Sequence, residues 1–426
     1  MKFHASSKTR LAGVALLFTA ALAGCGGSGS GSLPPPAAAP APVAAPAPLV
    51  FSAFPSAVAV IGQEGFDQLA PVGSPGTLNI PVGEPAVTAD GRLFVADFGT
   101  KTLKVFSRYD QHGPSVDFPG VADPRSVSIH SGRLVVIDGN NVRIFESATP
   151  GAAQLAVAGS APVCSAAGLR APSSAHLTPT GRLVVADAAN NRVLIWNQVT
   201  PGQPLGDANV VLGQPSMIAC EANGGGTSPS DSTLSGPSSV WSDGNRLIVA
   251  DSGNHRVLVW DSLPTASFQP ARTVLGQRNF TDALANAGGL NVRSAMSLDL
   301  PVAVDVNDAG QLAVMDQQNH RMLLWNRIPD AGAHGQPADQ VIGQDGFTTD
   351  RASDLPSDRT LSNEPHGLRF HGTDLIVVDS ENNRVLVWRG TAPPPVAPPP
   401  VVGAPPPALP FPTETTEPPG PGVGAY

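Results

Sequence analysis

Short apolar runs recur along residues 51–390, and polar turn residues separate them. One example is the run GRLVVAD, which ends at Asp187 and is followed after a polar turn by RVLIW, which ends at Trp196. Each run has the length and the β-branched composition of a strand, with Gly, Asn or Pro at its ends. The runs are apolar at nearly every position, which favours sheets that are covered on both faces.

Six segments align on this pattern, and each leads from an aspartate to an aromatic residue. They are Asp97 to Phe106, Asp138 to Phe145, Asp187 to Trp196, Asp251 to Trp260, Asp316 to Trp325 and Asp379 to Trp388. Four of the five Trp in the chain occupy this one position. A Pro-led strand precedes the aligned segments, and a strand with the signature VLGQ follows several of them. The repeating unit therefore contains four strands.

Six such units predict an all-β fold, a six-bladed β-propeller. The sixth unit ends at Trp388 without a VLGQ strand, whereas an unmatched copy, Val60-Ile61-Gly62-Gln63, stands at the other end. We expect this N-terminal strand to complete the last blade and close the ring. Residues 51–390 should then form one domain with no free sheet edge at the seam, and a monomer is the expected state.

The turn signature resembles a known repeat. The segments Asn254-His255-Arg256 and Asn319-His320-Arg321, each followed by apolar residues and Trp, are similar to the NHL repeat, with Arg in place of the Leu that gives the repeat its name. The resemblance covers residues 57–388 and implies a six-bladed propeller. It implies no single activity, because the family includes protein-binding, nucleic-acid-binding and enzymatic members.

Residues 1–24 have the pattern of a secretory signal, with basic residues before an apolar run too short to span a bilayer. The following Leu22-Ala23-Gly24-Cys25 resembles the lipobox of bacterial lipoproteins. That resemblance implies cleavage before Cys25 and lipidation of its thiol and amine. Because Gly26 follows rather than Asp, it also implies the outer membrane, facing the periplasm or the cell exterior. An ordinary cleaved signal with a chance cysteine is the alternative.

Proline-rich segments flank the domain, with seven prolines in residues 31–50 and fourteen in 391–426. We expect a tether over residues 25–50 and a disordered tail over 391–426. The chain carries 25 basic and 34 acidic residues, a net charge of -9, and has no basic run. This composition argues against a nucleic-acid partner, and membrane contact is expected through the lipid anchor only.

The repeated polar residues have a structural interpretation. Six aspartates in register resemble a ring of metal ligands, but each opens a tight turn, where it can pair with the Asn or Arg that follows. His255 and His320 belong to the same turns, and the repeated Trp residues are expected to pack between blades. We therefore predict no metal and no other cofactor from the repeat.

Function is expected where the repeat varies. One position of the innermost strand differs in every unit: it holds Ala86 or Val87 in the first, and Ser128, His176, Trp241, Asp305 and Arg369 in the others. Unlike groups around one axis are what a shaped pocket needs, so this column is a candidate ligand site. The alternative is a set of varied packing positions in a solvated channel.

Four long connections, residues 64–78, 215–234, 278–298 and 345–361, should lie on one face of the ring, which we call the looped face. Recognition surfaces are often loops on a rigid scaffold. The candidate contacts there are residues that do not repeat, namely Arg293, Asp350, Arg351, Glu364 and His366. Cys220, in the connection 215–234, and Cys164, in the shorter connection before the third unit, are a possible disulfide in an oxidising compartment.

Two functions remain open. The favoured one is a non-catalytic envelope lipoprotein that binds a protein, a glycan or a small molecule. The alternative is a metal-dependent lyase or lactonase-like hydrolase, with zinc or calcium on the axis held by residues such as His176, Asp305, Glu364 and His366. No HExxH, GxSxG or P-loop pattern supports the second function.

Overall fold

A computed structural model describes residues 46–393, except 70–72, 74, 160–163, 204, 289–291 and 352–354. The predicted signal sequence, Cys25, and most of the expected tether and tail lie outside the described residues. Within the described residues, we find no helix that combines the length and apolar character needed to cross a membrane.

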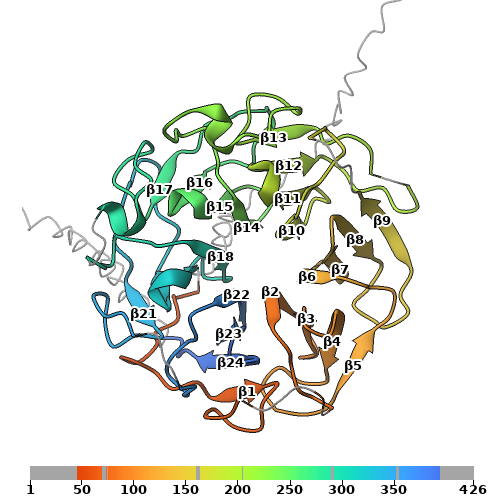
Figure 1. Cartoon of the computed structure of the whole chain (residues 1–426), viewed down its shortest axis with the longest axis vertical. Coiled ribbons are helices and arrows are strands. Elements are labelled where there is room, and N and C mark those ends of the chain that lie inside the picture. Colours follow the sequence, from red (N-terminus) through yellow and green to blue (C-terminus); the bar gives the residue numbers. More distant parts are fainter. Residues whose placement is uncertain are drawn as a thin grey trace, which may run out of the picture. The chain divides into compact units, whose positions relative to one another are not determined.

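The described strands form six antiparallel four-stranded sheets around a central axis (Figure 1). Blades 1 and 2 contain β2 (Pro81–Val87), β3 (Leu93–Asp97), β4 (Thr102–Phe106), β5 (Ser115–Phe118), β6 (Pro124–His130), β7 (Arg133–Asp138), β8 (Asn141–Phe145) and β9 (Gln154–Ala158). Blades 3 and 4 contain β10 (Ser174–Leu177), β11 (Leu183–Asp187), β12 (Arg192–Trp196), β13 (Val210–Leu212), β14 (Pro237–Ser242), β15 (Leu247–Asp251), β16 (Arg256–Trp260) and β17 (Thr273–Leu275).

Blades 5 and 6 contain β18 (Pro301–Val306), β19 (Leu312–Asp316), β20 (Arg321–Trp325), β21 (Gln340–Ile342), β22 (Pro365–His371), β23 (Asp374–Asp379), β24 (Arg384–Arg389) and β1 (Ala59–Ile61). Short 3-10 helices lie in the turns and connections: η1 (Ala188–Asn190), η2 (Ala222–Gly225), η3 (Ser252–Asn254), η4 (Ala285–Gly288) and η5 (Gln317–Asn319). The innermost strands of blades 1 to 6, nearest the axis, are β2, β6, β10, β14, β18 and β22 (Figure 1). The six-bladed, all-β prediction is thus confirmed.

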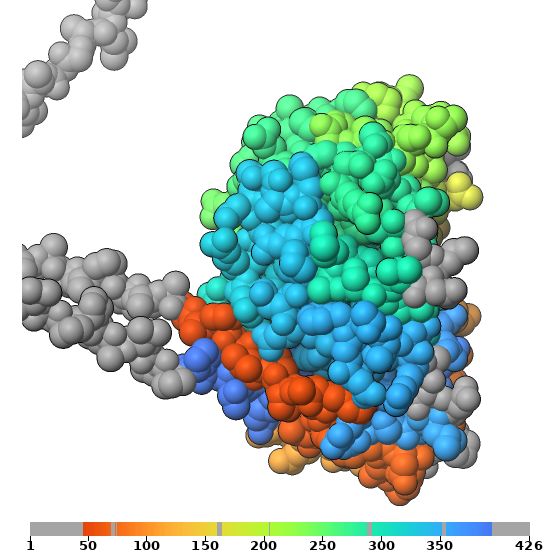
Figure 2. Space-filling view, turned by 90° about the vertical axis from the view of Figure 1, so that its left-hand side faces the viewer, coloured from red at the N-terminus to blue at the C-terminus, as the bar shows by residue number. Residues whose placement is uncertain are grey.

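The ring closes as predicted, by a strand from the N-terminal side of the domain. Strand β1 pairs antiparallel with β24, and Val60 lies opposite Leu386. Figure 2 shows these N-terminal residues, in red, packed against the blue C-terminal residues. The chain before β1 also belongs to the folded unit, because Leu49 and Phe51 are buried and Val50 bridges to Thr391.

Apolar side chains on both faces of each sheet pack against the neighbouring blades. Between blades 3 and 4, for example, Val184 and Ile195 share one buried cluster with Val249 and Trp260. The indole nitrogen of Trp260 donates a hydrogen bond to the carbonyl of Gln269, 3.0 Å away. The four repeated Trp side chains are almost fully buried. This burial on two faces explains why the strands are apolar at consecutive positions.

The repeated aspartates organise the turns between the second and third strands. In blade 4, Asp251 accepts hydrogen bonds from Asn254 (2.7 Å) and Arg256 (2.8 Å) through Oδ2, and from the backbone N–H of Ser235 through Oδ1. His255 has a left-handed backbone, with φ of +52°. Blades 3, 5 and 6 repeat this arrangement around Asp187, Asp316 and Asp379.

Each of these arginines also holds the connections before and after its blade. Arg256 donates to the carbonyls of Phe280, Ser230 and Thr233. In the same way, Arg321 and Arg384 donate to the carbonyls of Phe347 and Phe66. The Asp–Arg pair is therefore a structural unit that fixes the base of the long loops.

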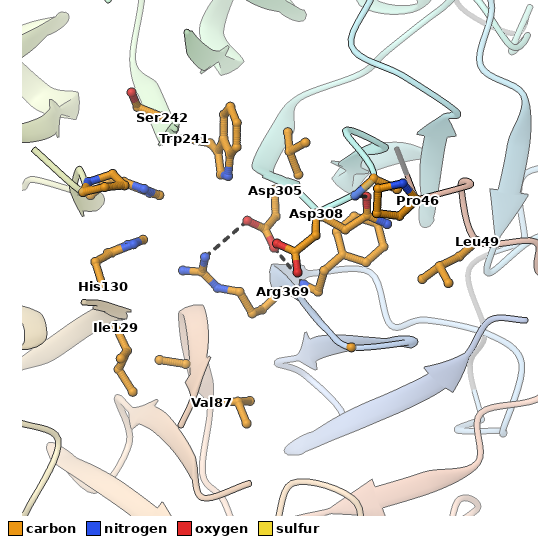
Figure 3. Close-up of a pocket in the computed structure, with 18 of the residues that line it drawn as sticks. Pro46, Leu49, Val87, Ile129, His130, Trp241, Ser242, Asp305, Asp308 and Arg369 are labelled. Atoms are coloured by element: carbon orange, nitrogen blue, oxygen red, sulfur yellow. Dashed lines mark hydrogen bonds and ion pairs between the residues drawn. The ribbon is translucent and has the colours of Figure 1, made fainter. Parts of the chain in front are cut away.

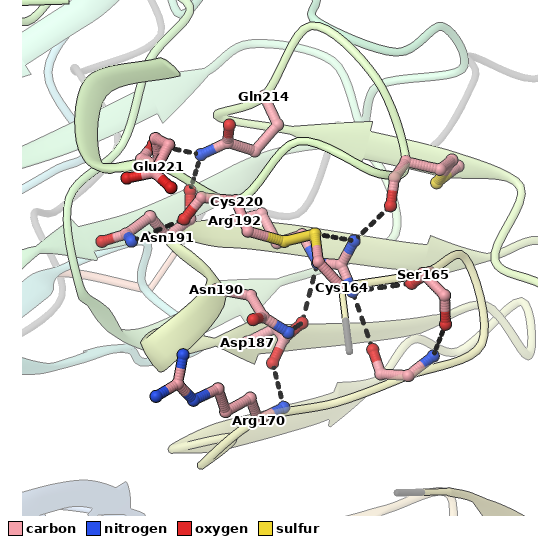
Figure 4. Close-up of a disulfide and its surroundings, with 12 residues drawn as sticks. Cys164, Ser165, Arg170, Asp187, Asn190, Asn191, Arg192, Gln214, Cys220 and Glu221 are labelled. Carbon is pink, nitrogen blue, oxygen red and sulfur yellow. Dashed lines mark hydrogen bonds and ion pairs between the residues drawn. A yellow bond between two sulfur atoms is a disulfide. The ribbon is translucent and has the colours of Figure 1, made fainter. Parts of the chain in front are cut away.

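A disulfide joins Cys164 and Cys220, whose Cα atoms lie 6.2 Å apart (Figure 4). It links the β9–β10 connection to the β13–β14 connection across blade 3. Arg192 lies beside it and donates to the carbonyls of Ser165 and Met217. The bond therefore reinforces the same loop bases that the buried Asp–Arg units hold.

Candidate functional site

The variable column of the innermost strands is in register around the axis. In blade 4, Trp241 lies opposite Ile248 of the second strand. In blade 5, Asp305 lies opposite Ala313, which occupies the same position of the second strand as Ile248 does in blade 4. Several column members line one cavity of about 490 Å³ at an end of the central channel, which we call the column cavity (Figure 3). Its polar and aromatic lining residues include His130, His176, Trp241, Asp305, Asp308 and Arg369.

Ser128, another member of the column, is not among the residues that line this cavity and is bonded within the wall of the channel. Its hydroxyl donates a hydrogen bond to the carbonyl of Ala175 in the next blade, 2.7 Å away. His130 lines the cavity in its place, with its ring centroid 3.6 Å from that of His176. Sequence reasoning missed His130, although residues two apart lie on the same face of a strand, and this spacing could have indicated it.

Asp305 and Arg369 form an ion pair inside the column cavity. Arg369 Nη1 lies 3.2 Å from Asp305 Oδ1, and the backbone N–H of Phe370 donates to Asp305 Oδ2 at 2.7 Å. Burial raises the pKa of Asp305 despite this guanidinium. Burial, and then the charge of Arg369, lower the pKa of His176 to about 3. His176 is therefore neutral at physiological pH.

Glu84 lies in the channel wall and was missed by the sequence analysis. Val82 pairs with Ala96 and Ala86 with Phe94, so three residues of β2 stand opposite one residue of β3. Gly83 permits this bulge with a φ of +66°, because a Cβ there would lie 2.0 Å from the carbonyl oxygen of Arg125. The unusual Gly-Glu-Pro segment in an innermost strand was the available signal.

Polar groups of four blades surround the Glu84 carboxylate. Oε1 accepts hydrogen bonds from the hydroxyls of Ser174 (3.0 Å) and Ser239 (2.5 Å), and Oε2 lies 4.0 Å from Arg369 Nη2. Burial raises the pKa of Glu84 to about 7, and the negative charge of Asp305 adds to the shift. Arg369 is thus shared between two buried carboxyl groups.

A second cavity, of about 750 Å³, opens where the innermost strands begin. We call it the turn-side cavity, because turn residues such as Asn140 and Gln317 line it. Glu364 and His366, two of the predicted contacts, also line it. Burial lowers the pKa of His366. Since Gly83 lines this cavity and Ala86 lines the column cavity, Glu84 lies on β2 between the two.

The four donors of the metal hypothesis are divided between these cavities. His176 and Asp305 line the column cavity, and Glu364 and His366 line the turn-side cavity. Across the described part of the chain, no group of three His, Cys, Asp or Glu side chains is placed to hold one metal ion. The structure therefore does not bring the four proposed donors to one point.

Two of the five predicted contacts, Arg293 and Asp350, bind each other. Arg293 forms an ion pair with Asp350 and donates to Asn319 at 2.9 Å. These contacts connect residues 278–298 to residues 345–361 through the turn of blade 5. Arg351 is exposed and lies 3.2 Å from Asp345. Arg293 and Asp350 therefore stabilise the looped face, because their charges are used in contacts within the protein.

Exposed apolar side chains gather on the long loops. Of eleven large hydrophobic side chains that are exposed in the described residues, six lie in the four long connections. These six are Leu69, Ile218, Leu284, Val292, Met296 and Leu355. These residues are not evident from the sequence, because the exposure of an apolar residue in a loop depends on how the loop folds.

A family model matches one of the repeated units. Residues 234–260 match the model of the NHL repeat family. We found no curated protein whose sequence matches this chain. Similar solved structures include a Bacteroides thetaiotaomicron protein of unknown function, at 14% identity and a TM-score of 0.46, with 79% of this chain and 75% of that chain covered.

Streptogramin B lyase is similar at 12% identity and a TM-score of 0.44, with 75% of this chain and 96% of that chain covered. Virginiamycin B lyase from Staphylococcus aureus is similar at 13% identity and a TM-score of 0.41, with 72% and 94% covered. By its own strand pairing the chain is a six-bladed β-propeller, and its fourth unit matches the NHL repeat.

Proposed function

We propose that the protein is a lipoprotein of the cell envelope, anchored through Cys25, whose propeller is a non-catalytic binding module for a protein or envelope ligand. The looped face carries the main binding surface. The supporting observation is the concentration of exposed apolar side chains on the four long loops, including Ile218, Leu284 and Leu355. Apolar groups that gather on a soluble surface mark interaction sites, because burying them against a partner is favourable.

The bases of these loops are rigid, which suits recognition. Arg321 donates to the carbonyls of Ser294 and Ser297 in one loop and of Phe347 in the next. Gln277 and Gln344 donate to loop carbonyls as well. A surface that is ordered before binding loses less conformational entropy when a partner docks.

The test uses point substitutions rather than shortened loops, since the loops supply carbonyls to buried arginines. A triple variant, Ile218→Ser, Leu284→Ser and Leu355→Ser, removes apolar surface from three loops. The matched control is Val116→Ser with Phe268→Ser, which removes exposed apolar groups outside the four long loops. Both full-length proteins are expressed in the native cells, and partners are captured by cross-linking of the intact envelope.

We expect the triple variant to lose the captured partner while its unfolding temperature stays close to that of the wild type. The control should retain the partner. Capture that survives in the triple variant, or fails equally in the control, contradicts the assignment of binding to the looped face.

A further inference from the structure

Carboxyl side chains outnumber Lys and Arg side chains in the lining of the column cavity. Arg369 is the single Lys or Arg side chain among the described residues that line it, whereas Asp305 and Asp308 both line it. Arg369 also lies 4.0 Å from Glu84, so its charge is already shared between two buried carboxyl groups. His176 does not add a charge, because burial keeps it neutral. The balance favours a positively charged occupant.

An aromatic wall stands beside these carboxylates. Trp241 is the one tryptophan outside the repeated position, and it lies on β14, next to the strand that carries Asp305. Its ring meets that of His176 edge to face, with centroids 6.3 Å apart. Figure 3 shows Trp241, Asp305 and Asp308 on one side of the cavity and His130 on another. An indole near a carboxylate is a favourable site for an organic cation.

Most of the remaining lining residues are apolar. Leu49, Val87 and Ile129 contribute hydrocarbon surface, and Pro46 lies at the same opening (Figure 3). A small inorganic cation would leave this surface without a partner, whereas an organic cation would cover it. A volume of about 490 Å³ lies within the usual range of small-molecule sites.

We propose that the column cavity binds an organic cation, an amine or quaternary ammonium with a small apolar body, with its charge between Trp241, Asp305 and Asp308. This site is separate from the looped face, since β18 runs from Val302 at the turn-side cavity to Asp305 at the column cavity. Neither site requires the other to function.

Three probes of similar shape test the charge preference: phenethylammonium, 2-phenylethanol and 3-phenylpropionate. A fourth probe, choline, is a cation without a ring. Binding to the full-length protein in non-ionic detergent is measured by titration calorimetry at pH 7.5. We expect at least one cation to bind, and phenethylammonium to bind at least about tenfold more tightly than the neutral alcohol.

Two variants locate the cation. Trp241→Leu keeps an apolar side chain and should weaken cation binding about tenfold, and Asp308→Asn, at an exposed position, should weaken it several-fold. The control Ile218→Ser changes the looped face and should leave cation affinity unchanged. The two proposals are tested by different measurements. Partner capture tests the looped face, whereas cation affinity tests the column cavity, so either proposal can fail while the other stands.

The proposal is overturned if 3-phenylpropionate binds as tightly as phenethylammonium, since Arg369 would then be the anchor. It is also overturned if neither cation binds at concentrations up to about 10 mM, because a weaker affinity than this is too low for a specific site. Cation binding that is unchanged in Trp241→Leu and Asp308→Asn contradicts it as well.

Discussion

Arg256 Nε lies 2.8 Å from Asp251 Oδ2, and both side chains are completely buried at the turn of blade 4. The guanidinium also donates to three backbone carbonyls. One arginine therefore pairs with a buried carboxylate and also holds the connections on both sides of its blade. A buried charge that loses its partner is expensive, because neither water nor another group replaces the interaction.

The variant Arg256→Met should therefore be strongly destabilised, by about 3–5 kcal/mol, since the buried carboxyl group of Asp251 loses its cationic partner. Thermal unfolding followed by circular dichroism measures the loss. The matched control is Arg327→Met, because Arg327 and Asp330 form an exposed pair and should contribute little. Equal effects of the two variants would show that burial of the pair is unimportant.

Glu84 should make stability depend on pH in a defined window. Burial raises its pKa from an ordinary value of 4.5 to about 7, so the folded state keeps a proton that the unfolded state releases. The contribution of this group to stability is therefore lost as pH rises from 4.5 to about 7, by about 3 kcal/mol in total.

Glu84→Gln removes this titration and retains an acceptor for Ser174 and Ser239. Relative to the wild type, the variant should gain stability as pH rises from 4.5 to 8, as measured by chemical denaturation at several pH values. His176 titrates in both proteins, so its effect cancels in the difference. A difference that stays constant across this range would refute the prediction.

The disulfide should contribute to stability through the chain that it closes. Cys164 and Cys220 are 56 residues apart, and in the chain-entropy account a loop of this length stabilises the folded state by about 4 kcal/mol. We expect a Cys164→Ala, Cys220→Ala variant to unfold at a lower temperature and to be cleaved faster by proteases within residues 215–234. An unchanged unfolding temperature would mean that the bond adds nothing to the buried Asp–Arg unit beside it.

The lipid anchor predicts a specific labelling pattern. Cells that incorporate an alkyne-bearing palmitate should label the wild-type protein, whereas Cys25→Ser should remain unlabelled and keep its signal sequence. Intact-mass measurement of the purified protein checks both outcomes. Labelling of Cys25→Ser, or cleavage at another residue in the wild type, would contradict anchoring at Cys25.

The repeated features of this protein could be predicted from the sequence because they recur from blade to blade. Asp251, Arg256 and Trp260 make the same contacts as their counterparts in blades 3, 5 and 6, so four near-identical segments indicated one local structure. The unmatched strand at Val60 was likewise recognisable, because the sixth unit lacked its partner.

The residues of the candidate site were harder to predict because their positions depend on local departures from the repeat. Glu84 reaches the channel through a bulge that only Gly83 permits, and this bulge has no equivalent of the same size in the other blades. Ser128 was predicted to face the axis, but its short side chain bonds to a neighbouring strand. The pairing of Arg293 with Asp350 depends on how two loops fold together.

Photo-cross-linking in cells shows whether partners bind the looped face. A photoreactive amino acid is placed at Leu284 or Ile218, and separately at Val116 on strand β5, in the full-length protein in intact cells. We expect the same discrete cross-linked product from both loop positions and none from Val116. Cross-linking from Val116 alone, or from none of the three positions, would contradict this expectation.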